Sequence, residues 1–252
     1  MNSIIVLQSE LSTELTATLV GERAAYAWDI HKLRSGVKIR AGVLGGKRGM
    51  AHVISATPQE SVLKMELELE SRTPLPIDLI VGVCRPQTSK KVLQVGSMLG
   101  VLSINFVGSE RTEKSYLQSK SLGEEFIVEH SLKALEQIWD TRLPTVSVSQ
   151  DMRRFLKAWQ DEEIGADQRI NLVASPGGVL LSDKDISQRI LGSDRISLAV
   201  GPEAGWSEGD LETLSQAGFV SVGMGERVVR VEVAVTALLS QVMFVRDLLR
   251  GN

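Results

Sequence analysis

The first 72 residues alternate between apolar and polar side chains over short runs that end at glycine turns. In the clearest run, residues 62–70, one face carries Leu63, Met65, Leu67 and Leu69. Residues 37–43 alternate in the same way and lead into the glycine-rich turn 45–49. A period of two predicts half-buried strands, and short strands joined by glycine turns are typical of a small barrel. We therefore expect a small β-barrel domain at residues 1–72.

The pattern changes beyond the prolines at positions 74 and 76, which interrupt regular pairing and mark a domain boundary. Apolar runs typical of buried strands cover residues 77–84, 102–107, 143–148, 169–174 and 196–200. Helical spacing of apolar residues covers 90–99, 129–142, 152–160, 208–217 and 232–249. Strands that alternate with helices predict an α/β domain with a parallel sheet at residues 73–252.

Two glycine-bearing segments near the C-terminus are the strongest candidates for a ligand site. In residues 198–210, an apolar run breaks at a Gly-Pro-Glu turn, and Ser207 is placed to cap the helix that follows. In residues 223–234, two glycines lead through two arginines into the last apolar helix. Glycine lets a ligand approach the backbone closely, and strand–loop–helix units of this kind hold nucleotide-like cofactors at the ends of parallel strands.

Together the two segments resemble the RsmE family of RNA methyltransferases, in the knotted SPOUT superfamily. That family carries a GPEGG-like loop and, further along, a segment similar to LGxRILRxETA; this chain has GPEAG at 201–205 and MGERVVRVEVA at 224–234. Residues 31–36 resemble part of the family's PUA-like N-terminal domain, which is expected to bind RNA. The resemblance implies a C-terminal SPOUT domain with a trefoil knot, a homodimer, and methylation of N3 of a uridine in small-subunit ribosomal RNA.

The resemblance also implies S-adenosylmethionine as the cofactor, held by three turns at 175–178, 201–205 and 224–229. These turns are expected to supply apolar walls for the adenine and backbone partners for its edge. The expected cofactor-binding residues are Ala174, Val200, Gly201, Glu203, Gly205, Met224, Gly225, Val228 and Val229. For Glu203 two roles stay open, one facing the ammonium group of the cofactor and one structural, at a helix start.

The expected chemistry points to the arginines of the second segment. Uracil N3 is a poor nucleophile until its proton leaves, so an enzyme must stabilise the resulting negative charge. Arg230 is the first candidate, because a guanidinium stays charged and donates paired hydrogen bonds, and Arg227 is the second. Glu232 is expected to orient an arginine, to take part in proton transfer, or to form a salt bridge with Arg227 or Arg230.

The net charge of this 252-residue chain is −3, so a nucleic-acid partner has to be sought in the local charge distribution. Residues 31–50 contain six basic side chains and no acidic one. These candidates for RNA binding are Lys32, Arg34, Lys38, Arg40, Lys47 and Arg48. A solvated basic face would show the same pattern; with the resemblance, ribosomal RNA or the small ribosomal subunit is the expected partner.

Other classes of protein lack their motifs here. GxxxxGK[ST] and a complete GxGxxG are both missing, so neither a P-loop nor a nicotinamide cofactor is expected. His31, His52 and His130 have no metal-ligand spacing, and no GxSxG elbow of a hydrolase is present. The single Cys84 lies in an apolar run and is expected to be a buried thiol. No run has the length of a membrane span and no signal peptide is evident, so we expect a cytoplasmic protein without a membrane partner.

The sequence departs from the family at several positions. Ala204 stands where the family favours glycine, and its methyl group is either tolerated or crowds the cofactor. Val233 replaces a threonine, which removes a possible hydrogen bond. The helix at 90–99 lacks the family's acidic residues. Residues 132–137 keep Glu136 but lose an arginine of the family's pattern. The polar positions of both segments are expected to shape the RNA cleft.

These departures leave alternatives open. The leading function is a methyltransferase acting on RNA; the second is a non-catalytic RNA-binding or ribosome-assembly factor on the same scaffold, and a third is a methyltransferase acting on protein or a small molecule. The apolar face of the last helix is expected either to form a homodimer interface or to pack on its own sheet. That face carries Val235, Leu238, Leu239, Val242 and Val245.

Overall fold

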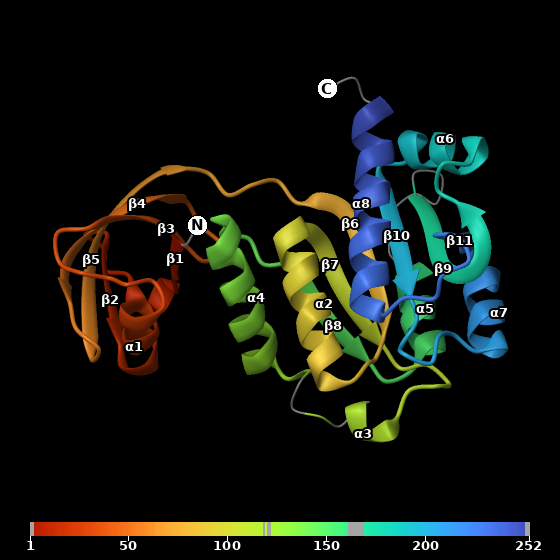
Figure 1. Cartoon of the computed structure of the whole chain (residues 1–252), viewed down its shortest axis with the longest axis horizontal. Helices are drawn as coiled ribbons and strands as arrows, with labels where there is room; N and C mark the ends of the chain where they lie inside the picture. The colour runs from red at the N-terminus through yellow and green to blue at the C-terminus, as the bar shows by residue number, and fades with distance from the viewer. Residues whose placement is uncertain (1–2, 118, 120–121, 161–168, 250–252) are drawn as a thin grey trace. The chain divides into compact units, whose positions relative to one another are not determined.

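The structure, a computed structural model, describes residues 3–117, 119, 122–160 and 169–249. The chain divides into two compact units, which are described separately here (Figure 1). The first unit comprises Met1–Pro74 and Glu129–Leu143, and the second comprises Leu75–Val128 and Pro144–Asn252. The first unit therefore includes a returning segment, residues 129–143, that the sequence did not assign to it.

The first unit is built on a curled, half-barrel sheet with the strand order β1-β3-β4-β5-β2. The strands are β1 (Ser3–Val6), β2 (Thr16–Val20), β3 (Lys38–Val43), β4 (Arg48–Ala56) and β5 (Glu60–Leu69). β1 pairs with β3 in parallel, whereas the other neighbours are antiparallel. The predicted alternation in β5 buries Leu63 and Met65 in the core of this unit, with Leu67 packed at its margin. The β-rich character of this part of the chain is thus confirmed.

Two short helices of the first unit were not predicted. They are the 3-10 helix η1 (Gln8–Glu10) and helix α1 (Gly21–Asp29). Helix α1 buries Ala24 and Ala27 against the sheet. Its N-cap position is Val20, whose side chain makes no capping hydrogen bond, so the usual start signal is missing from the sequence.

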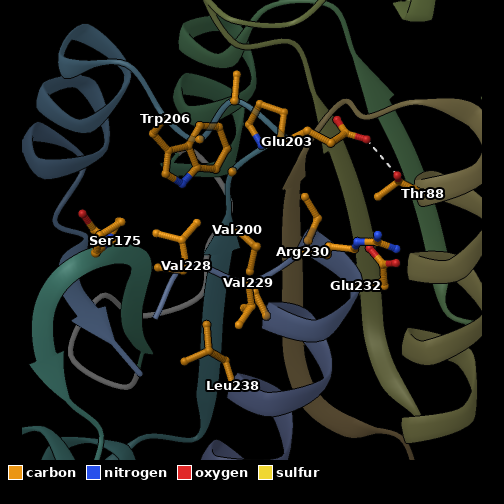
Figure 2. Close-up of a pocket in the computed structure, with 18 of the residues that line it drawn as sticks. Thr88, Ser175, Val200, Glu203, Trp206, Val228, Val229, Arg230, Glu232 and Leu238 are labelled. Carbon is orange, nitrogen blue, oxygen red and sulfur yellow. Dashed lines mark hydrogen bonds between the residues drawn. The ribbon is translucent and has the colours of Figure 1, made fainter. Parts of the chain in front are cut away.

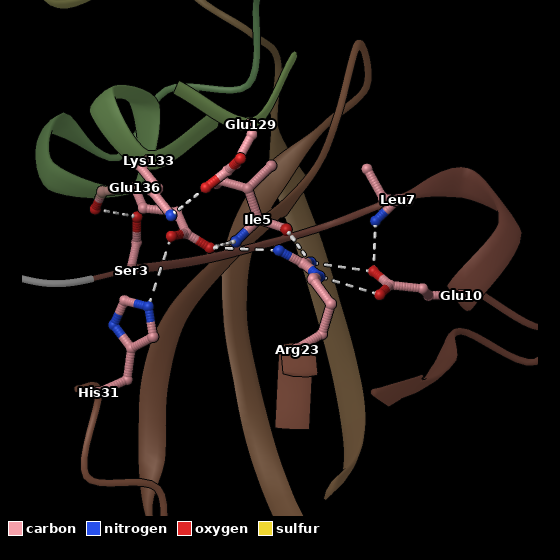
Figure 3. A network of polar contacts seen from close by, with 9 residues as sticks. All are labelled: Ser3, Ile5, Leu7, Glu10, Arg23, His31, Glu129, Lys133 and Glu136. Carbon is pink, nitrogen blue, oxygen red and sulfur yellow. Dashed lines mark hydrogen bonds and ion pairs between the residues drawn. The ribbon is translucent and has the colours of Figure 1, made fainter. Parts of the chain in front are cut away.

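The returning segment joins the first unit through the buried side chain of Glu136 in helix α4 (Glu124–Ile138) (Figure 3). The carboxylate accepts a hydrogen bond from the N–H of Ile5 at 3.4 Å and lies 3.8 Å from Arg23 Nη1. His31 Nε2 lies 3.5 Å from its second oxygen. Glu136 is therefore engaged inside this unit, and its expected part in shaping an RNA cleft stays a prediction.

The second unit is built on six parallel strands in the order β11-β9-β10-β6-β7-β8. The strands are β6 (Leu75–Gly82), β7 (Val101–Val107), β8 (Thr145–Ser149), β9 (Arg169–Leu180), β10 (Arg195–Val200) and β11 (Val220–Gly223). The helices are α2 (Pro86–Leu99), α3 (Lys114–Leu117), α5 (Met152–Gln160), α6 (Lys184–Gly192), α7 (Glu208–Gln216) and α8 (Val231–Leu249). The predicted α/β fold with a parallel sheet is confirmed.

Helices cover both faces of this sheet (Figure 1). On the central strand β6, Ile77 and Leu79 belong to the hydrophobic cluster that includes α2, α6 and α8. Ile80 belongs to the cluster on the other face, with residues of α5 and α7. Alternate residues of a strand point to opposite faces, so a strand covered on both faces reads as one continuous apolar run.

The apolar face of α8 packs inside this unit. Val235, Leu238, Leu239 and Val242 are at most 1% exposed, and Val245 is packed against the same cluster. Of the two alternatives for this face, the structure shows packing on the chain's own sheet.

Several element boundaries differ from the prediction. Helix α2 begins at Pro86 rather than at residue 90, with the proline in the first turn, where its missing N–H costs nothing. Helix α4 begins five residues earlier than expected, and α3 and α6 were not predicted. For α6 a signal was present, because the Asp183 side chain accepts hydrogen bonds from two N–H groups of the first turn.

Candidate active site

A cavity of about 1200 Å³ lies at the carboxyl ends of the parallel strands of the second unit (Figure 2). Its walls are residues 174–176 within β9, the segments that follow β6, β7, β10 and β11, and the beginnings of α2 and α8. Open parallel sheets bind their ligands at this edge, because the loops there carry side chains and free backbone groups from several strands.

The loop after β10 turns back sharply on itself. A Cβ at Gly201 would lie 2.9 Å from the backbone nitrogen of Trp206, and Gly205 has a φ of +70°. Both positions therefore favour glycine. The hydroxyl of Ser207 then accepts a hydrogen bond from the N–H of Asp210, whose carboxylate accepts one from the N–H of Ser207. The predicted cap of α7 is confirmed.

Strand β9 contributes an excursion to the cavity. Ser221 of β11 opposes Val173 of β9, and the next residue, Val222, already opposes Val179. Residues 174–178 are passed over in this register, and Ala174, Ser175 and Pro176 line the cavity. The sequence predicted that the strand ends at this turn; the pairing is interrupted there and then resumes.

The nine residues predicted to bind the cofactor all line this one cavity. They are Ala174, Val200, Gly201, Glu203, Gly205, Met224, Gly225, Val228 and Val229. The side chains of Val200, Val228 and Val229 line it together with those of Trp206 and Leu238 (Figure 2). The structure thus brings together segments of β9, β10 and the β11–α8 loop that are far apart in the sequence.

Glu203 is held in a structural position. Its Oε1 accepts a hydrogen bond from the N–H of Arg85 at 3.2 Å. It also accepts one from Thr88 Oγ1 at 2.7 Å (Figure 2). Arg85 is the N-cap residue of α2, so this carboxylate caps a helix that lies more than a hundred residues earlier in the chain. Of the two roles considered for Glu203, this contact supports the structural one, at the start of α2.

Glu232 and the two candidate arginines lie at the same cavity. Lys91 Nζ donates to Glu232 Oε1 at 2.8 Å, and this hydrogen bond is the main cause that lowers the pKa of the Glu232 carboxyl. The positive charge of Arg230 lowers the same pKa further. The sequence considered Arg227 or Arg230 as ion-pair partners of Glu232; the ion pair found among the described residues is with Lys91.

Sequence reasoning gave no role at the cavity to several residues that line it. They are Arg85, Lys91, Arg111, Tyr116, Trp206 and Leu238. A signal was available for two of them: Arg85 follows the carboxyl end of β6, and Arg111 follows that of β7. Carboxyl ends of neighbouring parallel strands meet at one edge of a sheet, so residues just after them are candidates for the site.

The departures from the family motifs are accommodated. Ala204 is exposed and is not among the described non-glycine residues with positive φ, so its position does not require glycine. Its carbonyl accepts a hydrogen bond from Arg111 Nη1 at 2.7 Å. Val233 is 47% exposed, so the threonine hydroxyl that it replaces would lie at the surface.

The predicted RNA-binding residues lie in the first unit, and Lys38 and Lys47 among them form ion pairs. Lys38 Nζ lies 2.9 Å from Glu66 Oε2, and Lys47 Nζ lies 3.0 Å from Glu70 Oε1. The hydrogen bond from Lys38 is the main cause that lowers the pKa of Glu66. The acidic residues on the outer face of β5 and at its end thus offset part of the positive charge of the basic patch, which is formed by the six predicted RNA-binding residues.

The arginines of the patch stack on tryptophans. The guanidinium of Arg34 lies 3.6 Å from the ring centroid of Trp28. Those of Arg40 and Arg48 lie 4.8 and 5.0 Å from the ring of Trp139, which belongs to the returning segment. For Lys32, the remaining member, the structure records a left-handed φ of 55°.

Two further observations concern the chain as a whole. Cys84 is 1% exposed, and burial raises the pKa of its thiol far above the usual value, as expected for a structural thiol. Among the helices of the described residues, none has both the length and the apolar character needed to cross a membrane.

Comparison with known proteins defines the class. Residues 71–243 match the family model described as an RNA methyltransferase domain. The ribosomal RNA small subunit methyltransferase E of Treponema pallidum is 32% identical over 213 residues, which cover 84% of this chain and 79% of that protein. The chain therefore belongs to the ribosomal RNA small subunit methyltransferase E (RsmE) family.

Solved structures share the fold. The ribosomal RNA small subunit methyltransferase E of Neisseria gonorrhoeae, bound to S-adenosylmethionine, has a TM-score of 0.72 at 23% identity and covers 95% of both chains. A protein of Legionella pneumophila in complex with the same cofactor has a TM-score of 0.77 at 20% identity, covering 96% of this chain and 98% of that one. At these identities the likeness shows the SPOUT-type fold.

Proposed function

We propose that the chain is a methyltransferase that uses S-adenosylmethionine to methylate N3 of a uridine in small-subunit ribosomal RNA. The observation that carries this proposal is the convergence of both glycine loops on one cavity, which places the nine expected cofactor residues together with Arg227, Arg230 and Glu232. Family membership supports the same activity.

The cavity fits the cofactor in two respects. Val200, Val229 and Leu238 supply an apolar wall suited to an adenine ring. A Cβ at Gly223 would lie 2.9 Å from the carbonyl oxygen of Gly178, so two backbone segments meet at the cavity without side chains between them. Such a cradle brings backbone N–H and C=O groups close to the edge of a bound base.

The arginines supply the electrostatics of the reaction. Bound S-adenosylmethionine would supply an electrophilic methyl group, and N3 of the uracil becomes a nucleophile when its proton is lost to solvent water. Arg230 is proposed to stabilise the resulting anion with two N–H donors of its guanidinium, and Arg227 to assist it or to bind a nearby phosphate. Donors placed before the reaction stabilise developing charge without reorganisation at that moment.

Glu232 is proposed to position the arginine rather than to accept the proton. Its hydrogen bond to Lys91 and the charge of Arg230 both lower its pKa, which makes the carboxylate a weak base. The same negative charge favours a nearby guanidinium, so Glu232 is suited to holding Arg230 at the cavity.

The first unit is proposed to bind the RNA as a PUA-like domain. The best candidates for contacts with RNA in this unit are Arg40 and Arg48, because both are arginines and both stack on Trp139. The guanidinium plane binds phosphate through paired hydrogen bonds, and stacking on an aromatic ring limits the entropy lost on binding. Lys32, Arg34, Lys38 and Lys47 are proposed to add to the positive field of this surface.

Three further properties are proposed on the basis of family membership. The SPOUT domain carries a trefoil knot, the enzyme is cytoplasmic, and it forms a homodimer. Because the predicted apolar face of α8 is buried inside the unit, the dimer contact is proposed to use its opposite face. Val233 and Phe244 are 47% and 64% exposed. They lie on one side of the helix, because they are eleven residues apart in the sequence.

The first test is calorimetric titration of the purified protein with S-adenosylmethionine, followed by methylation of small subunits that lack the modification. Saturable binding at one site and one new N3-methyluridine in the ribosomal RNA are expected. No binding at millimolar cofactor would refute the proposal and favour a non-catalytic RNA-binding factor. Binding with methylation of a protein or small molecule only would contradict the assigned substrate.

A further inference from the structure

The cavity carries more positive charge than the cofactor loops explain. Among the described residues that line it, five are cationic and two are carboxylates. The cations are Arg85, Lys91, Arg111, Arg227 and Arg230. Both carboxylates are engaged within the protein, Glu203 with the start of α2 and Glu232 with Lys91. The cavity is therefore suited to an anion in addition to the cofactor.

Two of the cations belong to loops that follow strands on one side of the sheet, away from the strands that carry the cofactor loops. Arg85 follows β6 and Arg111 follows β7, and these two strands are paired in parallel with Gly82 opposite Val107. The proposed cofactor residues lie within the excursion of β9 or belong to the ends of β10 and β11 and the loops after them, on the other side of β6 in the order β11-β9-β10-β6-β7-β8. The loops after β6 and β7 thus form a separate, basic edge of the same cavity.

The surroundings of the two guanidinium groups differ. Tyr116 lines the same cavity as Arg85 and is the main cause that raises the pKa of this arginine, which keeps its guanidinium charged. Arg111 Nη1 donates to the carbonyl oxygen of Ala204 in the cofactor loop. A guanidinium has five N–H donors, so one contact with the protein can fix its position while others bind an anion. Arg85 and Arg111 are both exposed at the surface.

We propose that Arg85 and Arg111 form a phosphate-binding edge that holds the backbone of the RNA next to the target nucleotide. This inference rests on the proposed function, and it assigns the RNA side of the cavity to the loops after β6 and β7. The excursion within β9 and the loops after β10 and β11 are left to the cofactor.

The experiment compares Arg85→Gln and Arg111→Gln with the matched control Arg189→Gln. Arg189 is an exposed arginine of α6 whose ion-pair partner is Asp185 of the same helix, and it does not line the cavity. The measured quantities are the Kd for a small-subunit ribosomal RNA fragment at several salt concentrations, the Kd for S-adenosylmethionine, and the KM and kcat for small subunits.

We expect each cavity variant to weaken RNA binding and raise the KM about tenfold, and to reduce the slope of log Kd against log salt by about 0.7. The Kd for S-adenosylmethionine should stay within about twofold of wild type, as should all values for Arg189→Gln. RNA affinity and salt slope equal to those of the control would overturn the inference. Loss of cofactor affinity equal to the loss of RNA affinity would do so too, because the arginines would then support the cofactor loops.

Tyr116→Phe tests whether the hydroxyl of Tyr116 acts on RNA binding through Arg85, since it keeps the ring and removes only the hydroxyl. It should raise the Kd for RNA in the wild-type background and have little further effect in the Arg85→Gln background. An equal effect in both backgrounds would show that Tyr116 acts independently of Arg85. Because RNA binding is measured directly, a wild-type protein that binds this RNA but does not methylate it would refute the proposed function and leave the phosphate-binding edge supported.

Discussion

Lys91 in α2 donates a hydrogen bond to Glu232 in the first turn of α8, across 141 positions of the sequence. The contact ties together the two helices whose first turns border the cavity, and it keeps a negative charge beside Arg230. The two side chains are 52% and 17% exposed, so the pair is partly hydrated, and its contribution to stability should be small.

The first prediction concerns this pair and pH. Lys91→Met should lower the free energy of unfolding by less than about 1 kcal/mol at neutral pH. Because the folded-state pKa of Glu232 is lowered, the pair stabilises the fold above the ordinary pKa of a glutamate, and this contribution is lost as the pH falls through the lowered value. Urea denaturation of both proteins from pH 7 to pH 3 should therefore show a difference that shrinks on acidification. A difference that grows towards low pH would contradict the assignment.

The second prediction concerns the two candidate arginines. Arg230→Ala should reduce kcat by about a hundredfold or more, as expected when a donor to a developing anion is removed. The Kd for S-adenosylmethionine should change little, and Arg227→Ala should have a smaller effect on kcat. Single-turnover methylation at saturating RNA and cofactor separates the rate of methyl transfer from the affinity for S-adenosylmethionine. Unchanged turnover in Arg230→Ala would exclude the role proposed for it.

The third prediction concerns the close approach of the β9 excursion to β11. In Gly223→Ala the new methyl group would meet the carbonyl oxygen of Gly178, so the backbone has to shift, and we expect the affinity for S-adenosylmethionine to fall at least about tenfold. Gly192→Ala is the matched control, because a Cβ there meets nothing within 4 Å. Calorimetry on both variants provides the test, and equal affinities would show that the cradle tolerates a side chain.

The fourth prediction separates paired from stacked cations in the first unit. Arg40→Gln with Arg48→Gln and Lys38→Gln with Lys47→Gln each remove two positive charges. The arginine pair should lower RNA affinity more and reduce the salt slope by about 1.4, whereas the lysines already face Glu66 and Glu70. Filter binding at several salt concentrations measures the RNA affinity and its salt slope for each double variant. Equal losses in the two double variants would mean that only the total charge of the surface matters.

The fifth prediction concerns the exposed face of α8. If Phe244 lies in a homodimer contact, Phe244→Asp should shift the protein from dimer to monomer in sedimentation analysis at micromolar concentration. Gln216→Asp, at an exposed position of α7, is the control for the added charge. A wild-type protein that sediments as a monomer would refute the dimer itself.

Much of the fold and the site followed from local patterns. The period of two along β5, the apolar runs of β6 and β10, and the Ser207 cap of α7 are all properties of a few consecutive residues. The signals of the glycine segments are local as well. The positive φ of Gly205 and the close approach of the backbone at Gly201 each restrict the residue type at their own position. Such constraints can be read without knowledge of the partners.

The partners themselves were decided by the tertiary structure. Glu203 caps α2 rather than a helix near it in sequence, Glu232 pairs with Lys91 rather than with a neighbouring arginine, and Glu136 is buried in the first unit. A carboxylate gains similar energy from any of several cations or N–H groups, so its choice depends on which of them the fold brings within about 3 Å. The buried face of α8 follows the same logic, since an apolar stripe requires burial but does not specify the surface that covers it.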